Sequence, residues 1–139
     1  MHEAWSGVPL VGNNAYGLRV YRNGSHLNMH VDKSETHIIS CILHVDHDDD
    51  PESEPWPLVI EDFQGNTNEV NLESGDMVFY ESSKAFHGRP RKFKGKWYSS
   101  IFVHYYPVGW DVSAQIKSNA AFYSTCLKSC WSCLTERKS

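Results

Sequence analysis

The sequence has only four cysteines among 139 residues, and their spacing is too uneven for a disulfide framework. The net charge is −4, so the excess of basic residues typical of a general nucleic-acid binder is absent. No apolar run approaches the roughly 18 residues of a membrane-spanning helix. The start, Met1-His2-Glu3-Ala4-Trp5, has neither the basic residues nor the apolar stretch of a secretory signal. These absences favour a soluble chain in a reducing, cytoplasmic compartment.

Internal repeats and Gly/Ser-rich or Pro-rich linkers are also lacking, so the length fits one domain. Apolar residues make up 40% of the sequence and charged residues 22%, which is enough to form a buried core and excludes a wholly disordered chain. We expect an N-terminal segment at residues 1–15, a domain at residues 16–110 and a tail at residues 111–139. The tail contains three cysteines, Cys126, Cys130 and Cys133. Because no fourth ligand accompanies them there, we expect no structural zinc site.

Patterns typical of β-strands dominate the chain. Only residues 113–134 are a candidate helix, and they lack a clean apolar stripe. Seven short strands with turn residues between them indicate an all-β sandwich, barrel or jelly roll. These strands are expected at residues 17–22, 27–32, 36–45, 58–62, 69–72, 77–80 and 96–106.

A pair of metal-ligating residue types lies on one of these strands. Alternation along residues 27–32 places His30 and Asp32 on the polar face, opposite an apolar face that begins at Leu27. An imidazole nitrogen and a carboxylate oxygen on one face can bind a metal, and His87 is the best candidate for a third ligand. Two histidines and one carboxylate select non-haem Fe(II) for oxygen chemistry. By spacing alone, a hydrogen-bonded surface pair is the competing interpretation.

Four motifs in a fixed order extend this pattern. They are Tyr21-Arg22-Asn23-Gly24-Ser25-His26-Leu27-Asn28-Met29-His30-Val31-Asp32, Gly75-Asp76-Met77-Val78-Phe79-Tyr80, His87-Gly88 and Gly95-Lys96-Trp97. Together they resemble the 2-oxoglutarate- and Fe(II)-dependent dioxygenases, specifically the prolyl 4-hydroxylase-like branch. The resemblance covers residues 16–106, most of the chain.

The resemblance implies a double-stranded β-helix, or jelly roll, with few short helices. It makes His30, Asp32 and His87 the iron ligands and the catalytic centre. The implied reaction uses O₂ and 2-oxoglutarate to hydroxylate a C–H bond, releasing succinate and CO₂, with ascorbate restoring oxidised iron. The substrate would be a peptide or a small molecule. Peptidyl proline is the best-known target of the family, but no loop motif in this chain selects it.

The resemblance also implies a site for the remote carboxylate of 2-oxoglutarate. Lys96 would bind this carboxylate, although it follows His87 one residue earlier than the family spacing. Arg89 and Arg91 compete for the role, but we expect both on a loop. Tyr21 would line the same pocket, and a tyrosine packed in the core is the alternative.

Two other functions are compatible with these residues. One is a non-catalytic jelly-roll module that binds a protein or sugar, and the other is a cupin-like metal enzyme without 2-oxoglutarate. Four further histidines are expected to lie on strands and to have local hydrogen-bond partners: His37, His44, His47 and His104.

Overall fold

A computed structural model of the chain describes residues 1–111, 113–114 and 117. The chain divides into two units, Met1–Val108 and Gly109–Ser139, and every strand that the structure describes lies in the first. The three tail cysteines lie outside the described residues, as does most of the candidate helix at residues 113–134. No helix in the described part of the chain is long and apolar enough to cross a membrane.

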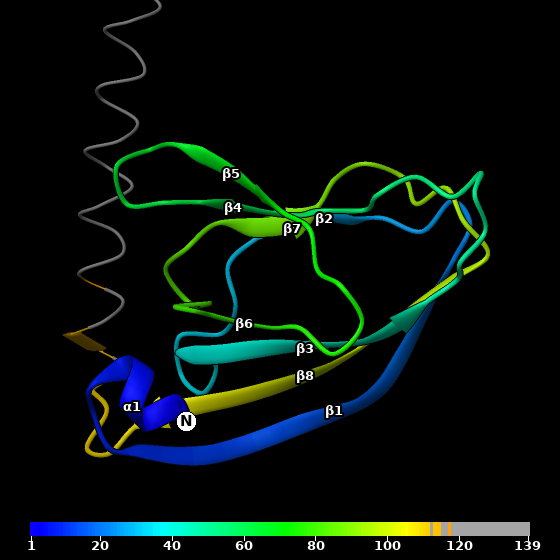
Figure 1. Ribbon diagram of the computed structural model, residues 1–139. Helices are drawn as coiled ribbons and strands as arrows, with labels where there is room; N and C mark the ends of the chain where they lie inside the picture. Colours follow the sequence, from blue (N-terminus) through cyan, green and yellow to red (C-terminus); the bar gives the residue numbers. More distant parts are fainter. Residues whose placement is uncertain (112, 115–116, 118–139) are drawn as a thin grey trace, which may run out of the picture. The chain divides into compact units, whose positions relative to one another are not determined.

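One short helix and eight strands follow one another in the first unit (Figure 1). They are α1 (His2–Ser6), β1 (Leu10–Arg22), β2 (Leu27–His30), β3 (Ile39–His47), β4 (Leu58–Glu61), β5 (Thr67–Val70), β6 (Met77–Tyr80), β7 (His87–Arg89) and β8 (Trp97–Pro107). Strand β1 begins before the domain boundary expected at residue 16. Strand β7 was not predicted, because three residues are too few to show a period.

The strands form two four-stranded antiparallel sheets, ordered β1-β8-β3-β6 and β2-β7-β4-β5. Figure 1 shows these sheets as two layers. The chain crosses from one sheet to the other at every connection except the β4–β5 hairpin, which stays within one sheet. This arrangement is a jelly roll, and it confirms the predicted fold class.

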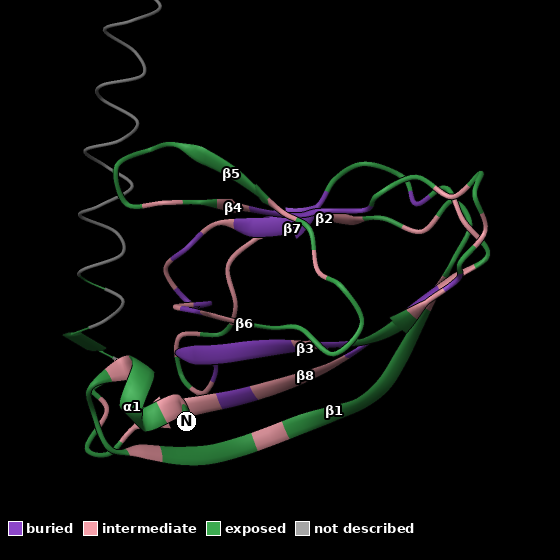
Figure 2. Cartoon of the chain, viewed as in Figure 1, coloured by how far each residue is buried: buried purple, intermediate pink, exposed green. Residues whose placement is uncertain are grey.

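The main core lies between the sheets. Ile42 of β3, Leu58 of β4 and Tyr80 of β6 form one buried apolar cluster. Burial follows the same division, since most of β3 and all of β7 are buried whereas β1 is largely exposed (Figure 2). Strands β3 and β7 each have neighbouring strands on both sides, whereas β1 lies at the edge of its sheet.

Strands β2 and β7 approach each other closely at Gly88. A Cβ atom at Gly88 would lie 2.8 Å from the Asn28 carbonyl oxygen and 2.9 Å from that of Leu27. Both atoms belong to the backbone of β2, so no side-chain rotation can relieve the contact. Only glycine fits between the strands at this point.

We therefore expect Gly88→Ala to push β2 away from β7 and to lower the stability of the fold by about 1–3 kcal/mol, the usual cost of overpacking. Urea denaturation of the metal-free protein measures this loss. Gly17→Ala is the matched control, because a Cβ at Gly17 meets no atom within 4 Å. Equal stability of the two variants would contradict the close approach.

Asp48 joins the loop after β3 to the turn before β8. Its Oδ2 accepts hydrogen bonds from the backbone N–H groups of Lys96 (2.8 Å) and Trp97 (3.1 Å). Its Oδ1 accepts one from the Ser53 hydroxyl. These bonds, led by that from Ser53, lower the pKa of Asp48 to about 2. The carboxylate form is thus the one that holds the two segments together.

Because its pKa is lower in the folded than in the unfolded chain, the Asp48 carboxylate stabilises the fold at pH values above its unfolded-state pKa of about 4. This contribution to stability is lost as the pH falls through about 2. We expect Asp48→Asn to have a lower melting temperature than the wild type at pH 7. The difference between the two melting temperatures should become smaller as the pH falls from 4 to 2. Thermal melts across this range test the prediction, and a gap independent of pH would contradict it.

Candidate metal site and its cavity

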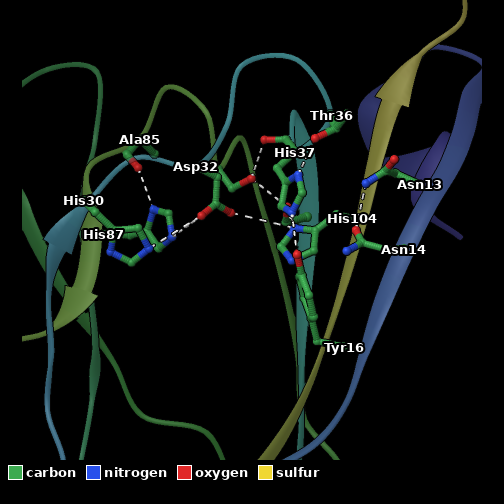
Figure 3. A network of polar contacts seen from close by, with 12 residues as sticks. Asn13, Asn14, Tyr16, His30, Asp32, Thr36, His37, Ala85, His87 and His104 are labelled. Atoms are coloured by element: carbon green, nitrogen blue, oxygen red, sulfur yellow. Dashed lines mark hydrogen bonds and ion pairs between the residues drawn. The ribbon is translucent and has the colours of Figure 1, made fainter.

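Two strand ends and one loop bring His30, Asp32 and His87 together, as Figure 3 shows. His30 ends β2 and pairs in register with His87, the first residue of β7. Asp32 follows β2, and its backbone N–H donates to the Ser82 carbonyl at 2.9 Å. Asp32 Oδ1 lies 3.5 Å from His30 Nε2 and 3.9 Å from His87 Nε2. One ligand atom of each residue lies within 4.8 Å of the others.

Backbone carbonyls fix which nitrogen of each imidazole is protonated. His30 Nδ1 lies 2.8 Å from the Asn28 carbonyl oxygen, and His87 Nδ1 lies 2.8 Å from that of Ala85. A carbonyl only accepts, so both Nδ1 atoms carry the hydrogen, and in the neutral rings both Nε2 atoms carry a lone pair. Burial lowers the pKa of His87, and its bond to Ala85 opposes this shift. In the neutral rings, three atoms with a lone pair thus converge: the two Nε2 atoms and Asp32 Oδ1.

A cavity of about 260 Å³ opens beside these three residues. Its walls come from both sheets and combine apolar, aromatic and basic side chains. They include Tyr16, Arg19 and Tyr21 from β1, Leu27 from β2, Ile42 from β3, Leu58 from β4, Tyr80 from β6, Arg89 from β7, and Phe102 and His104 from β8.

Two register shifts decide which residues face this cavity. In β1, Tyr16 pairs with Phe102 but Arg19 pairs with Ser100, so an extra residue interrupts the alternation. A bulge of this kind lets Tyr16 and Arg19 line the same wall. A register shift between Leu27 and His30 in β2 likewise lets these two residues line the same wall. The prediction that Leu27 lies on the face opposite His30 is therefore wrong, because strict alternation does not hold there.

Arg89 is the buried cation of the cavity. Its guanidinium packs against the rings of Trp56 and Tyr98, at 4.7 Å and 4.6 Å from their centroids, and the residue is 4% exposed. Its guanidinium donates to the Trp56 carbonyl and, at 3.0 Å, to the Tyr98 hydroxyl. No carboxylate in the described part of the chain pairs with it. Burial lowers the pKa of Arg89, but a guanidinium stays protonated in proteins.

Arg89 was expected on a loop, but it lies at the end of β7. Arg89 was named as a competitor of Lys96, but its placement on a loop was wrong because β7 gave no signal in the sequence. In a strand, residues two apart share a face, so Arg89 lies on the same side of β7 as His87, about 6.6 Å along the strand. Arg91 is exposed and pairs with Glu69 at 2.8 Å.

Lys96 is not brought to the cavity. Its side chain is 71% exposed, and Nζ pairs with Asp50 at 2.8 Å. The two bonds from Asp48 to the Lys96 and Trp97 amides hold this turn, and β8 begins only at Trp97. Tyr21 does line the cavity, and its ring packs edge-on against Trp56 at 4.9 Å.

A second group of polar side chains lies on the other side of Asp32 (Figure 3). His104 Nδ1 is 3.7 Å from Asp32 Oδ2, and the His37 and His104 rings lie 4.0 Å apart. Burial, followed by the effect of His37, lowers the pKa of His104 to about 4. Both histidines have local hydrogen-bond partners, as expected, and His104 lies on β8, but His37 precedes β3 rather than lying on a strand. The sequence did not indicate that the two adjoin the candidate metal site.

No protein-family model and no curated protein matches the sequence. A crystal structure of a Pseudomonas putida prolyl-4-hydroxylase matches the fold with a TM-score of 0.56 and 17% sequence identity. The match covers 67% of this chain and 50% of that chain, so the present chain spans about half the length of the hydroxylase. At this identity, the likeness supports the jelly-roll fold alone.

Proposed function

We propose that the protein is an Fe(II)- and 2-oxoglutarate-dependent dioxygenase. The observation that carries this proposal is the convergence of His30 Nε2, His87 Nε2 and Asp32 Oδ1, which lie within 4.8 Å of one another while both Nδ1 atoms are engaged by backbone carbonyls. Three acceptor atoms that face one another repel unless a cation lies between them. Two neutral imidazoles and a carboxylate suit non-haem Fe(II) and leave coordination positions free for other ligands.

The groups around the three proposed ligands also suit a metal site. Hydrogen bonds from Nδ1 to the Asn28 and Ala85 carbonyls orient both imidazoles, as outer partners do in known metal sites. The backbone bond from Asp32 to Ser82 holds the carboxylate-bearing loop. When bound, Fe(II) supplies the activation of O₂ needed to hydroxylate a C–H bond. The task of the chain is to bind the ligands, orient them and exclude water.

Arg89 supports 2-oxoglutarate as the second ligand of the cavity. A buried guanidinium without a carboxylate partner in the described chain is costly unless an anion completes it. His87 and Arg89 lie about 6.6 Å apart along β7, a separation that a five-carbon dicarboxylate can span. In this proposal the 2-oxo acid end faces the metal ligands, and the remote carboxylate receives N–H bonds from Arg89. Tyr21 lines the same wall.

This assignment gives Arg89 the role that Lys96 would have by resemblance. Lys96 already has an anionic partner in Asp50 and lies at the surface. The primary substrate, a peptide or a small molecule, would enter beside the exposed edge of His30, whose side chain is 37% exposed. Ascorbate is proposed as the reductant that restores oxidised iron.

Anaerobic titration tests the proposal directly. Fe(II) is added to the purified protein, followed by 2-oxoglutarate, and the weak visible metal-to-ligand charge-transfer band is recorded. We expect the band to appear only when both are present. Decarboxylation of 2-oxoglutarate to succinate is then measured in air with candidate peptides.

Two other results would overturn the proposal in different ways. Uptake of Fe(II) without any effect of 2-oxoglutarate would favour a cupin-like metal enzyme. A folded protein that takes up no metal would favour a non-catalytic binding module.

A further inference from the structure

A chain of buried hydrogen bonds runs from the candidate metal site into the core. His104 Nδ1 lies 2.6 Å from Ser40 Oγ, which lies 2.6 Å from Ser82 Oγ. Ser82 Oγ in turn donates to the His37 carbonyl oxygen at 2.8 Å. Both serines are fully buried, and His104 is 4% exposed. Water therefore offers these groups no alternative partners.

The donor and the acceptor of every hydrogen bond in this series follow from its last acceptor, the His37 carbonyl oxygen. A carbonyl only accepts, so the single hydroxyl hydrogen of Ser82 points to His37. Ser82 must then accept from Ser40, which uses the single hydroxyl hydrogen of Ser40. Ser40 can only accept from His104, so the hydrogen of that bond is on His104 Nδ1. This series of hydrogen bonds therefore excludes the tautomer of His104 that has no hydrogen on Nδ1.

His104 Nδ1, whose hydrogen bonds Ser40, also lies near the proposed ligand Asp32. It lies 3.7 Å from Oδ2, which is too long for a hydrogen bond but close enough for the positive end of the N–H dipole to attract the carboxylate. The other oxygen, Oδ1, faces His30 and His87. In the opposite tautomer, Nδ1 carries a partial negative charge at the same distance from Oδ2 and repels it.

We infer that His104 is a positioning residue for Asp32, and that the Ser40–Ser82 chain sets its role by fixing the Nδ1–H tautomer. The inference rests on the proposed metal site, because its consequence is the orientation of one ligand of that site. A residue that orients a ligand typically changes metal affinity by about 10- to 100-fold when it is lost.

Nitrogen-15 NMR of the metal-free protein measures the tautomer without any metal or activity. We expect the His104 signals of the Nδ1–H form in the wild type and a shift toward the Nε2–H form in Ser82→Ala, where Ser40 becomes free to donate to His104. Ser100→Ala is the control, since Ser100 is equally buried on β8 and its hydroxyl has no hydrogen-bond partner in the described structure. An Nε2–H wild type would overturn the inference.

Co(II) binding, followed by its visible spectrum, tests the effect on the site. His104→Asn keeps an amide N–H near the Nδ1 position, whereas His104→Gln moves its amide to the Nε2 position. We expect His104→Asn to stay within about threefold of the wild type and His104→Gln to bind Co(II) at least about tenfold more weakly, with an altered spectrum. Ser82→Ala should weaken binding in the same direction, and Ser100→Ala should not.

The failures are distinguishable. Equal Co(II) affinity of His104→Asn and His104→Gln, whether retained or lost, would overturn the positioning role while the proposed function stands. A wild type that binds no Co(II) would overturn the proposed metal site and this inference with it. Thermal melts of the metal-free variants separate both results from a failure to fold.

Discussion

The His87→Ala protein is expected to lose Fe(II) binding by more than about 100-fold, beyond the range seen when only an orienting partner is removed. His87 supplies one of three lone pairs, and its side chain is 3% exposed, so water replaces its nitrogen poorly. The charge-transfer band with 2-oxoglutarate should disappear together with the metal. Anaerobic Fe(II) titration of wild type and variant measures the change.

His26→Ala provides the matched control, because His26 is an exposed histidine outside the cavity lining. It should bind Fe(II) and 2-oxoglutarate as the wild type does. Asp32→Ala should behave as His87→Ala does. Full metal affinity in either ligand variant would show that the three residues do not form the metal site.

Replacing Arg89 by leucine is expected to weaken 2-oxoglutarate binding by about 100-fold, equivalent to about 3 kcal/mol for a buried charge pair. Fe(II) binding should be retained, since Arg89 contacts Trp56 and Tyr98 rather than the proposed ligands. The variant should also lose its preference for 2-oxoglutarate over 2-oxopentanoate, which lacks the remote carboxylate. Titration of the Fe(II)-loaded protein with each acid measures both effects.

Lys96→Leu separates the two basic candidates. Its ammonium group is exposed and pairs with Asp50, so we expect no change in affinity for either acid. Arg89→Lys, which keeps the charge but loses the planar fork, should fall between Arg89→Leu and the wild type. A large loss in Lys96→Leu with none in Arg89→Leu would return the role to Lys96.

Much of the architecture is readable from local patterns. The short apolar run at residues 77–80 and the longer one at residues 36–45 predicted strands, and the structure has β6 at the first and β3 over most of the second. Turn residues such as Asn23-Gly24 marked the gap between β1 and β2, where Gly24 has a φ of 83°. These signals are local because a strand is recognised by the pattern of its own side chains, and a turn by a glycine with the backbone freedom that the turn requires.

The cavity was harder to predict because it depends on breaks in that alternation. The bulge after Tyr16 moves Arg19 and Tyr21 onto the cavity wall. The alternation of side chains in the sequence does not predict where such a bulge occurs. Strand β7 is too short to be recognised, so Arg89 was expected on a loop. Lys96 was expected to begin the strand at residues 96–106 and to bind the 2-oxoglutarate carboxylate, but β8 begins at Trp97 and the Lys96 side chain lies at the surface, paired with Asp50.

The sequence by itself determined the all-β class, most strand positions and the three residues that the structure brings together as a candidate metal site. Residue types and their spacing carry this information. Only the tertiary structure decided which basic residue lies beside that site and how Asp32 is held between two pairs of histidines. Those outcomes depend on pairing between strands distant in the chain, on bulges that reset side-chain direction and on burial. No local stretch of sequence specifies any of the three.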